Sequence, residues 1–285
     1  MEEVENKKQI NEIKKEINVK EVKEKKQFKI MGFTVTRLLA YFVLYSVLGF
    51  LIETTFGLIT KGVIESRKSF LYGPFCGIYG LGAVIMILGL QRFKKNNYTL
   101  FFGGFFIGSV VEYAISLIGE IIFHIKWWDY SHAILNINGR ICLVFSIFWG
   151  ILAIYLIKHI QPKIDKFLDK FRPSYVKTIT IVIFAFMMLD MLVTGFALKM
   201  FFTRLEKNYD LDIKGVEEYS EMYTRLYENP KIEKVVDKYF NDKVIMMTFP
   251  NIKITTNDGE IIWICDILKD VPTYYYKVFT PRIAR

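Results

Sequence analysis

Long apolar blocks alternate with short polar stretches along the middle of the chain. An apolar helix of about 20 residues crosses a hydrocarbon core of ~30 Å. The pattern therefore predicts an all-α polytopic membrane protein with about five transmembrane helices. The predicted spans are residues 38–60, 74–91, 98–123, 141–158 and 176–202.

Polar sequence flanks these blocks on both sides. Residues 1–31 are rich in Lys and Glu, which favours a solvated tail over a marginal amphipathic helix. We therefore divide the chain into this polar N-terminal tail, a helical bundle at 32–205 and a small C-terminal extramembrane region at 206–285. The C-terminal region is predicted to form either a small domain or a lid on the bundle.

The C-terminal region carries its own secondary-structure signals. Residues 216–227 and 232–240 have helical patterns of apolar positions. Residues 253–264 alternate around an Asn-Asp-Gly sequence, which predicts a β-hairpin.

Four carboxylates lie inside the predicted spans. A charge at the centre of a bilayer costs about 2.5–3.5 kcal/mol on insertion scales, so such residues are candidates for function. For Glu53 there is an alternative to a functional role. The residue lies near a helix end, and in this alternative its side chain only reaches the lipid headgroups. The candidates for a substrate or ion pathway are Glu53, Glu112, Glu120 and Asp190.

Small and polar residues recur at every fourth position near these acids. Residues at this spacing are neighbours on one face of a helix. Small residues beside an acid predict a close contact with another helix, which hides the carboxylate from lipid. Because four residues turn slightly more than one helical turn, Glu112 and Glu120 lie about 80° apart and could line one cavity. The two rows are Gly49, Glu53, Gly57 and Gly104, Gly108, Glu112, Ser116, Glu120.

The connection after the third span is unusually polar and aromatic. Tryptophan and tyrosine at a span end are ordinary interface anchors, and this alternative stays open for Trp127 and Trp128. Buried acids need partners, so Arg140 is expected to pair with Glu120 or Asp129. The predicted outer-face polar cluster comprises Arg67, Trp127, Trp128, Asp129, Tyr130, Asn136, Asn138 and Arg140.

The basic residues predict an orientation. The formal net charge is +9, but the excess lies beside the spans, which argues against nucleic acid as a partner. The tail and the loops 91–97 and 158–177 carry 18 Lys and Arg, whereas the connections 61–70 and 124–140 carry five. This bias predicts a multi-pass plasma-membrane protein with a cytoplasmic N-terminus, and five spans place the C-terminal region outside.

No motif predicts a cofactor. The cysteines Cys76, Cys142 and Cys265 are far apart, so they indicate neither a metal site nor a disulfide framework. The chain has no GxxxxGK[ST] sequence and does not bind ATP by that device. We predict no cofactor, no metal and no catalytic residue, and an enzyme is not favoured.

A second amphipathic segment follows the fourth span at 159–172. Its apolar residues fall on one helical face and its lysines lie away from that face. The pattern predicts a helix that lies on the membrane surface or docks a partner, and we favour the surface.

These residues carry a resemblance over about 40–155. The chain resembles a bacterial family of ABC transporter permeases, the CmpB-like or type IV group. The resemblance implies a multi-span membrane protein, and it implies transport by the family's name only. If a separate ABC ATPase docks, the segment 159–172 is the expected place. The chain departs from the family at Lys68-Ser69, often Arg-Gly, and at Gly77, often Pro. The matching stretches are Glu53, 69–74, 78–80, Glu112-Tyr113, Glu120, 127–131, 136–143 and Trp149-Gly150.

Three functions remain open at this point. The first is a permease subunit that moves a solute through a glycine- and carboxylate-lined bundle. The second is a membrane-embedded enzyme in which outer-face Glu, Asp and Asn side chains, with Arg140 nearby, act as acid, as base or as ligands of a hard cation. The third is a non-catalytic sensor or assembly protein in which the polar residues form a ligand pocket or only an internal brace. The bilayer is the predicted partner in each case, and a homo-oligomer is left open.

Overall fold

The computed structural model describes residues 28–123 and 125–280, so most of the predicted tail at 1–31 lies outside the described residues. In the described part, four helical stretches are long and apolar enough to cross a membrane. The shorter apolar helix α3 (Gly77–Leu90) continues into the 3-10 turn Gln91–Phe93. The all-α polytopic fold is confirmed. The four long stretches are α2 (Val35–Lys61), α4 (Asn97–Phe123), Leu143–Leu168 and α7 (Pro173–Tyr209).

The helix α3 starts later than the sequence pattern predicts. Ser69 donates its amide to the Phe75 carbonyl, and Cys76 donates its amide to Ser46 of α2. These bonds keep the Gly73-Pro74 segment in a folded loop as far as Cys76. At 1.5 Å per residue, the 17 residues from Gly77 to Phe93 span only about 25 Å.

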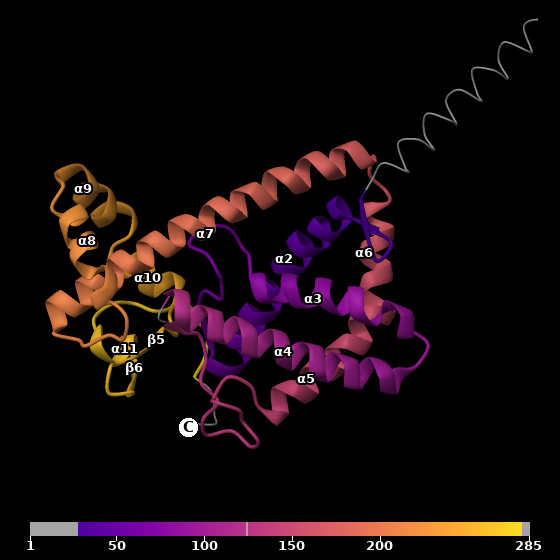
Figure 1. Cartoon of the computed structure of the whole chain (residues 1–285), viewed down its shortest axis with the longest axis horizontal. Coiled ribbons are helices and arrows are strands. Elements are labelled where there is room, and N and C mark those ends of the chain that lie inside the picture. The colour runs from indigo at the N-terminus through magenta and orange to yellow at the C-terminus, as the bar shows by residue number, and fades with distance from the viewer. Residues whose placement is uncertain (1–27, 124, 281–285) are drawn as a thin grey trace, which may run out of the picture.

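The helices α2, α3, α4 and the following α5 (Leu143–Tyr155) pack as neighbours, and α7 packs on α2 (Figure 1). Figure 1 shows α2, α4 and α7 running toward the end of the bundle that bears the C-terminal region, while α3 and α5 run back. The chain therefore crosses between the two ends five times.

A π-helical segment breaks the fourth span. The π-helix Leu156–Ile160 joins α5 to α6 (Gln161–Leu168), and such wide turns are a recognised cause of helix bends. Figure 1 shows α6 lying across the end of the bundle between α5 and the start of α7. The predicted amphipathic segment at 159–172 thus exists, but its helix ends at Leu168.

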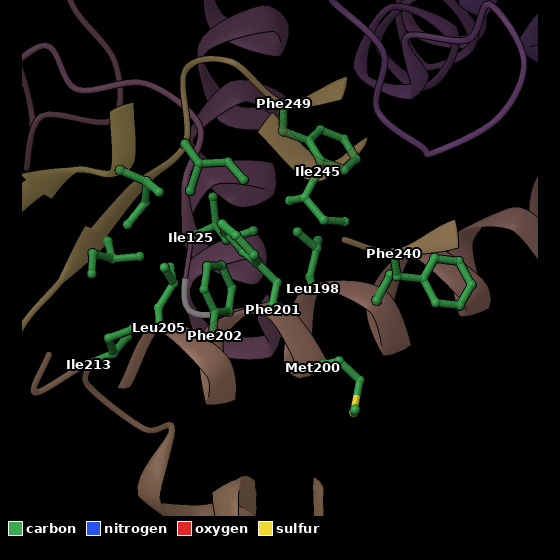
Figure 2. Packing of buried hydrophobic residues seen from close by; sticks show 14 of the residues in the cluster. Ile125, Leu198, Met200, Phe201, Phe202, Leu205, Ile213, Phe240, Ile245 and Phe249 are labelled. Carbon is green, nitrogen blue, oxygen red and sulfur yellow. The ribbon is translucent and has the colours of Figure 1, made fainter. Parts of the chain in front are cut away.

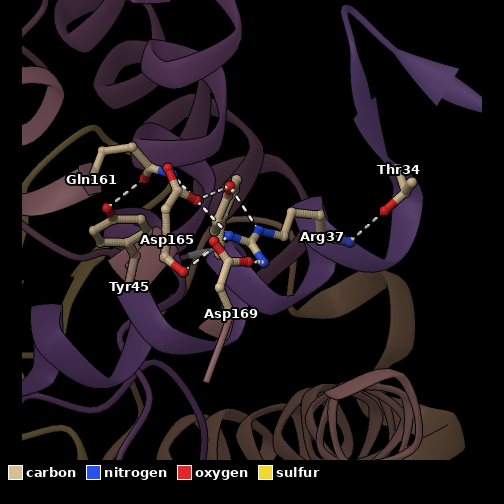
Figure 3. Close-up of polar contacts among 7 residues, drawn as sticks. Thr34, Arg37, Tyr45, Gln161, Asp165 and Asp169 are labelled. Carbon is tan, nitrogen blue, oxygen red and sulfur yellow. Dashed lines mark hydrogen bonds and ion pairs between the residues drawn. The ribbon is translucent and has the colours of Figure 1, made fainter. Parts of the chain in front are cut away.

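A polar network that the sequence did not reveal fastens α6 to α2 (Figure 3). The Arg37 guanidinium contacts Asp165 Oδ1 at 2.8 Å and Asp169 Oδ1 at 2.9 Å. About two turns further along α2, the Tyr45 hydroxyl donates to Gln161 Oε1 at 2.7 Å. These contacts fix the amphipathic segment to the end of the bundle where α2 begins.

The C-terminal region contains four helices among the described residues, and both predicted helices are confirmed. The predicted hairpin is also present, with Lys253 opposite Trp263 and Thr255 opposite Ile261. The strand β4 (Ile125–Lys126) extends this hairpin on the β5 side. The elements are α8 (Glu217–Tyr227), α9 (Pro230–Tyr239), α10 (Asp242–Thr248), β5 (Lys253–Thr255), β6 (Ile261–Trp263) and α11 (Ile264–Ile267).

The core of the C-terminal region is shared with the last turns of α7. Figure 2 shows Leu198, Phe201 and Phe202 of α7 packed with residues such as Ile245 of α10. Ile125, directly after α4, is fully buried in the same cluster. The hydrophobic core therefore crosses position 205, where the sequence placed a boundary.

Two short strand pairs complete the structure. The strand β3 (Val63–Ile64) follows α2 and pairs antiparallel with β7 (Tyr276–Lys277) near the end of the described chain. The strands β1 (Lys29–Ile30) and β2 (Phe33–Thr34) form a hairpin before α2.

The glycine contacts between helices predict a measurable effect on stability. A Cβ at Gly104 of α4 would overlap the Cβ of Ala153 and approach the Trp149 carbonyl oxygen of α5. We expect Gly104→Ala to lower the free energy of unfolding by about 1–3 kcal/mol, because overpacking forces the helices apart. Thermal unfolding in detergent measures this.

Gly82→Ala on α3 is the matched control. No atom lies within 4 Å of the Cβ position at Gly82, so a gain in helix propensity of about 0.5–1 kcal/mol is the expected effect. Equal melting temperatures for the two variants would contradict the close packing of α4 on α5.

Candidate functional site

Glu112 lies at the centre of the polar site. Its side chain comes from the middle of α4 and the residue is only 3% exposed. Oε1 accepts a hydrogen bond from the Tyr130 hydroxyl at 3.1 Å, and Oε2 accepts one from the Trp149 indole Nε1 at 3.0 Å. Both oxygens of this buried carboxylate therefore have protein donors, as a polar group in an apolar interior requires.

Glu53 is connected to the same site through two aromatic rings. Its Oε1 accepts a hydrogen bond from the Tyr79 hydroxyl at 2.7 Å. The Tyr79 ring lies 5.8 Å from the Trp149 ring, between centroids. A continuous series of side-chain contacts thus joins α2, α3, α5 and α4 through Glu53, Tyr79, Trp149 and Glu112. The carboxylate of Glu53 faces the protein rather than only reaching for headgroups.

The glycine rows make this arrangement possible. A Cβ at Gly49 would overlap the Tyr79 ring, and a Cβ at Gly108 would overlap the Trp149 ring. The predicted close helix contacts at both rows are confirmed. Each glycine lies one turn before its carboxylate, so each admits the aromatic residue that donates to Glu53 or Glu112.

Arg140 forms a second group at the end of α4. Its guanidinium contacts Glu120 Oε2 at 2.7 Å and donates to the Ser116 hydroxyl at 3.2 Å. It also lies over the Tyr113 ring, 5.7 Å from the centroid. Of the two expected partners, Glu120 is the one that Arg140 contacts. The row from Gly104 to Glu120 therefore faces first Trp149 and then Arg140, as its winding along the helix requires.

Asp129 and Asn136 brace the loop between β4 and α5. Asp129 Oδ1 accepts from the Ser131 amide at 3.1 Å and from its hydroxyl at 2.6 Å. Asn136 Nδ2 donates to the carbonyls of Ser131 and Ala133. Burial acts to raise the pKa of Asp129, but the Ser131 hydrogen bonds, with Lys126 and Lys253 nearby, hold this pKa below its ordinary value. Asp129 is thus a charged brace of the loop.

Asn138 and Trp128 close the turn over the end of α4. Asn138 has a φ of 53° and donates to the Tyr113 hydroxyl at 2.8 Å. The Trp128 indole donates to the Arg140 carbonyl at 2.8 Å. These bonds hold the Arg140 backbone while its side chain reaches Glu120.

The other aromatic residues of the loop pack inside the protein. Trp127 lies against Phe249 of the C-terminal region, with ring centroids 6.0 Å apart. Tyr130 stacks on Phe145 of α5 at 4.8 Å. Trp127 therefore connects the bundle to the C-terminal core, and Tyr130 aligns its hydroxyl with Glu112.

Asp190 belongs to a separate group on α7. Its Oδ2 accepts the Tyr72 amide at 3.0 Å, and Thr194 one turn on accepts the Leu71 amide. The acid at this depth therefore holds the loop before α3 against α7. Glu112 and Asp190, which both lie inside predicted spans, are bound by different elements.

Arg67 pairs mainly with a residue that the sequence analysis passed over. Its guanidinium contacts Glu65 at 2.6 Å and Glu53 at 3.9 Å. Glu65 is 6% exposed and also contacts Lys61 at 2.9 Å. Glu65 follows the end of α2 and the strand β3, so no helical spacing in the sequence marked its pair with Lys61.

Among residues 28–123 and 125–280, no group of three or more His, Cys, Asp or Glu side chains could hold a metal ion. Cys76 and Cys142 are buried, as expected for small core residues, and Cys265 is half-buried.

A family model described as "Putative ABC-transporter type IV" matches residues 40–195. The chain belongs to this family. The matched interval of the type IV family covers most of α2 and all of α3, α4 and α5. It includes Glu53, Glu112, Arg140 and Asp190 with their contacts, and it identifies a membrane protein of ABC-transporter type. No curated protein and no solved structure matches the chain.

The ion pair at the end of α4 yields the second prediction. Arg140 is 12% and Glu120 21% exposed in their side chains. We expect Arg140→Ala to lower the free energy of unfolding by about 1–3 kcal/mol, because it removes the ion-pair partner of Glu120 and the hydrogen-bond donor of Ser116. Thermal unfolding in detergent measures the loss.

A double-mutant cycle isolates the pair. Glu120→Gln in the Arg140→Ala background should cost less than Glu120→Gln alone, since the partner is already absent. Strictly additive changes in the free energy of unfolding would show that the two side chains do not stabilise one another.

Proposed function

We propose that this chain is the permease subunit of an ABC-type transporter. The observation that carries the proposal is a continuous series of side-chain contacts inside a bundle of apolar helices. The series runs from Glu53 through Tyr79 and Trp149 to Glu112. Carboxylates at membrane depth on facing helices are typical of solute and ion pathways. The pathway runs between α2, α3, α4 and α5 along these residues.

A separate ATPase supplies the energy in this proposal, because the sequence contains no GxxxxGK[ST] pattern. Its docking surface is the outward face of α6 and the turn that follows, where Lys163, Lys166 and Lys170 are exposed. The Arg37 contacts with Asp165 and Asp169 join this surface directly to α2, which carries Glu53. A movement of α6 would thus be transmitted to Glu53 through α2 alone.

The proposed orientation places α6 in the cytoplasm. The polar stretches at its end of the bundle carry 18 Lys and Arg against five on the connections at the other end. The C-terminal region is then outside the plasma membrane, because it packs at the end of the bundle opposite α6 (Figure 1).

Copurification tests the partner. The tagged chain is extracted from its native membrane in mild detergent, and a stoichiometric ATPase with its own Walker motifs should copurify. Reversal of the exposed charges by Lys163→Glu, Lys166→Glu and Lys170→Glu should remove the ATPase, while the folded chain is recovered in the same amount.

Charge reversal at Lys94 and Lys95 is the matched control. Both lysines are exposed and lie on the other loop at the same end of the bundle. The ATPase should still copurify with this variant. A pure chain without any ATPase, before any substitution, would contradict the permease proposal.

A second candidate function is a non-catalytic membrane protein in which the site is only a brace. The observation that favours it is that Glu112 already has a donor on each oxygen. In this case Glu112→Gln places an amide N–H opposite the Tyr130 or Trp149 donor and costs about 1–3 kcal/mol of stability, with no other effect.

Glu112→Gln therefore separates the two candidates. For a permease we expect a complex that keeps its ATPase but hydrolyses ATP at a rate changed several-fold, because the pathway residue has altered. For a brace, the melting temperature falls and the hydrolysis rate per folded complex is unchanged. Glu260→Gln, at an exposed carboxylate of the C-terminal hairpin, is the control for both measurements.

A further inference from the structure

Two apolar segments far apart in the sequence remain exposed near the end of the bundle that bears the C-terminal region. The first is the tip of the loop before α5, where Ile134 and Leu135 are each 73% exposed. The second is the aromatic segment around β7, where Tyr275 is 55% and Tyr276 65% exposed. Contiguous exposed apolar side chains of this kind mark an interaction surface.

The loop tip has a fixed shape. Asn136 donates to the carbonyls of Ser131 and Ala133 and accepts the Gly139 amide, and Ile137 donates its amide to Ile141. Leu135 has a φ of 52°, an uncommon conformation for a branched side chain. The apolar tip is therefore held outward by the fold.

The tip also lies at the start of a span. Leu143, the first residue of α5, donates its amide to the Ile134 carbonyl. Val144 beside it is exposed, as are Ile147 and Ile151 further along the helix. The apolar surface of the tip is thus continuous with the outward face of a membrane helix.

The aromatic segment is fastened at the end of another span. Gly62, which follows the last residue of α2, accepts the amides of Val278 and Phe279, and Ile64 accepts the amide of Tyr275. The last turns of α2 expose Phe56 and Ile59 on their outer surface. The segment therefore lies at the level where α2 leaves the bilayer.

We infer that both segments lie in the lipid interface and anchor this end of the protein to the bilayer. Tyrosines with a neighbouring lysine, Lys277, have the composition that prefers the boundary between headgroups and acyl chains. The aliphatic tip of the loop enters the same leaflet beside α5. The partner of this surface is the lipid bilayer itself, because both segments continue lipid-facing surfaces of spans.

Depth-dependent quenching tests the inference on the full chain in phospholipid nanodiscs. Leu135→Cys and Tyr275→Cys are made in a Cys265→Ser background and labelled with an environment-sensitive fluorophore, since Cys76 and Cys142 are buried. Lipid carrying a spin label near its headgroup should quench both probes several-fold more strongly than it quenches a probe outside the membrane. Aqueous iodide should show the opposite order.

Met222→Cys on α8 is the matched control, because Met222 and Tyr275 are equally exposed at 55%. Figure 1 shows α8 at the far side of the C-terminal region from the loop before α5. Iodide quenching of the Leu135 and Tyr275 probes as strong as that of the Met222 probe would overturn the inference. Shielding from both quenchers would also overturn it, because a protein partner would then cover the surface.

Each labelled variant must elute and melt like the parent protein. Where Leu135→Cys or Tyr275→Cys does not, Ile137→Cys and Tyr274→Cys replace them, since Ile137 and Tyr274 are also exposed on the same two segments. The quenching outcomes and their meaning are unchanged. They do not depend on any ATPase, so the lipid anchor and the permease proposal can fail separately.

Discussion

A carboxylate inside an apolar bundle must find its hydrogen-bond donors within the protein, and this constraint organises the helices around Trp149. Its indole donates to Glu112, and its ring contacts Tyr79, which donates to Glu53. The ring fits because Gly108 leaves room for it. A lost donor would leave a buried carboxyl oxygen unsatisfied, which costs more than the hydrogen bond contributes. The positions of α3 and α5 against α2 and α4 follow from this requirement.

Much of the fold follows from local patterns in the sequence. Hydropathy locates the spans, the four-residue glycine rows locate the close helix contacts, and alternation around Asn257-Asp258-Gly259 locates the hairpin. The ion pair of Arg140 with Glu120 is one of the two pairings that the sequence predicts. A buried acid and the nearest cation at the same span end have few other partners. These predictions succeed because each depends on neighbours in sequence or on a shared depth.

The remaining features depend on contacts between distant segments, for which the sequence has no spacing rule. Nothing near Glu53 indicates that Tyr79 donates to it, and nothing near Asp190 indicates that its donor is the Tyr72 backbone amide. The bend at Leu156–Ile160 and the Arg37 network are invisible for the same reason. Glu112 and Asp190 were both pathway candidates because each lies inside a predicted span, but a position inside a span does not fix the direction in which a helix face points.

The two ends of the bundle differ in the contacts that supplement their buried hydrophobic clusters. At the α6 end, α2 is joined to α6 by partly exposed ion pairs of Arg37, and pairs of this kind contribute little free energy in water. At the other end, β3 after α2 pairs with β7, β4 after α4 pairs with β5, and the end of α7 lies in the C-terminal hydrophobic core. The exits of three spans are therefore fixed to one folded unit there. Burial of apolar surface opposes separation of the helices at both ends, since Leu38 and Tyr41 of α2 share a buried hydrophobic cluster with Leu156, Ile157 and Leu168 at the end where α6 lies.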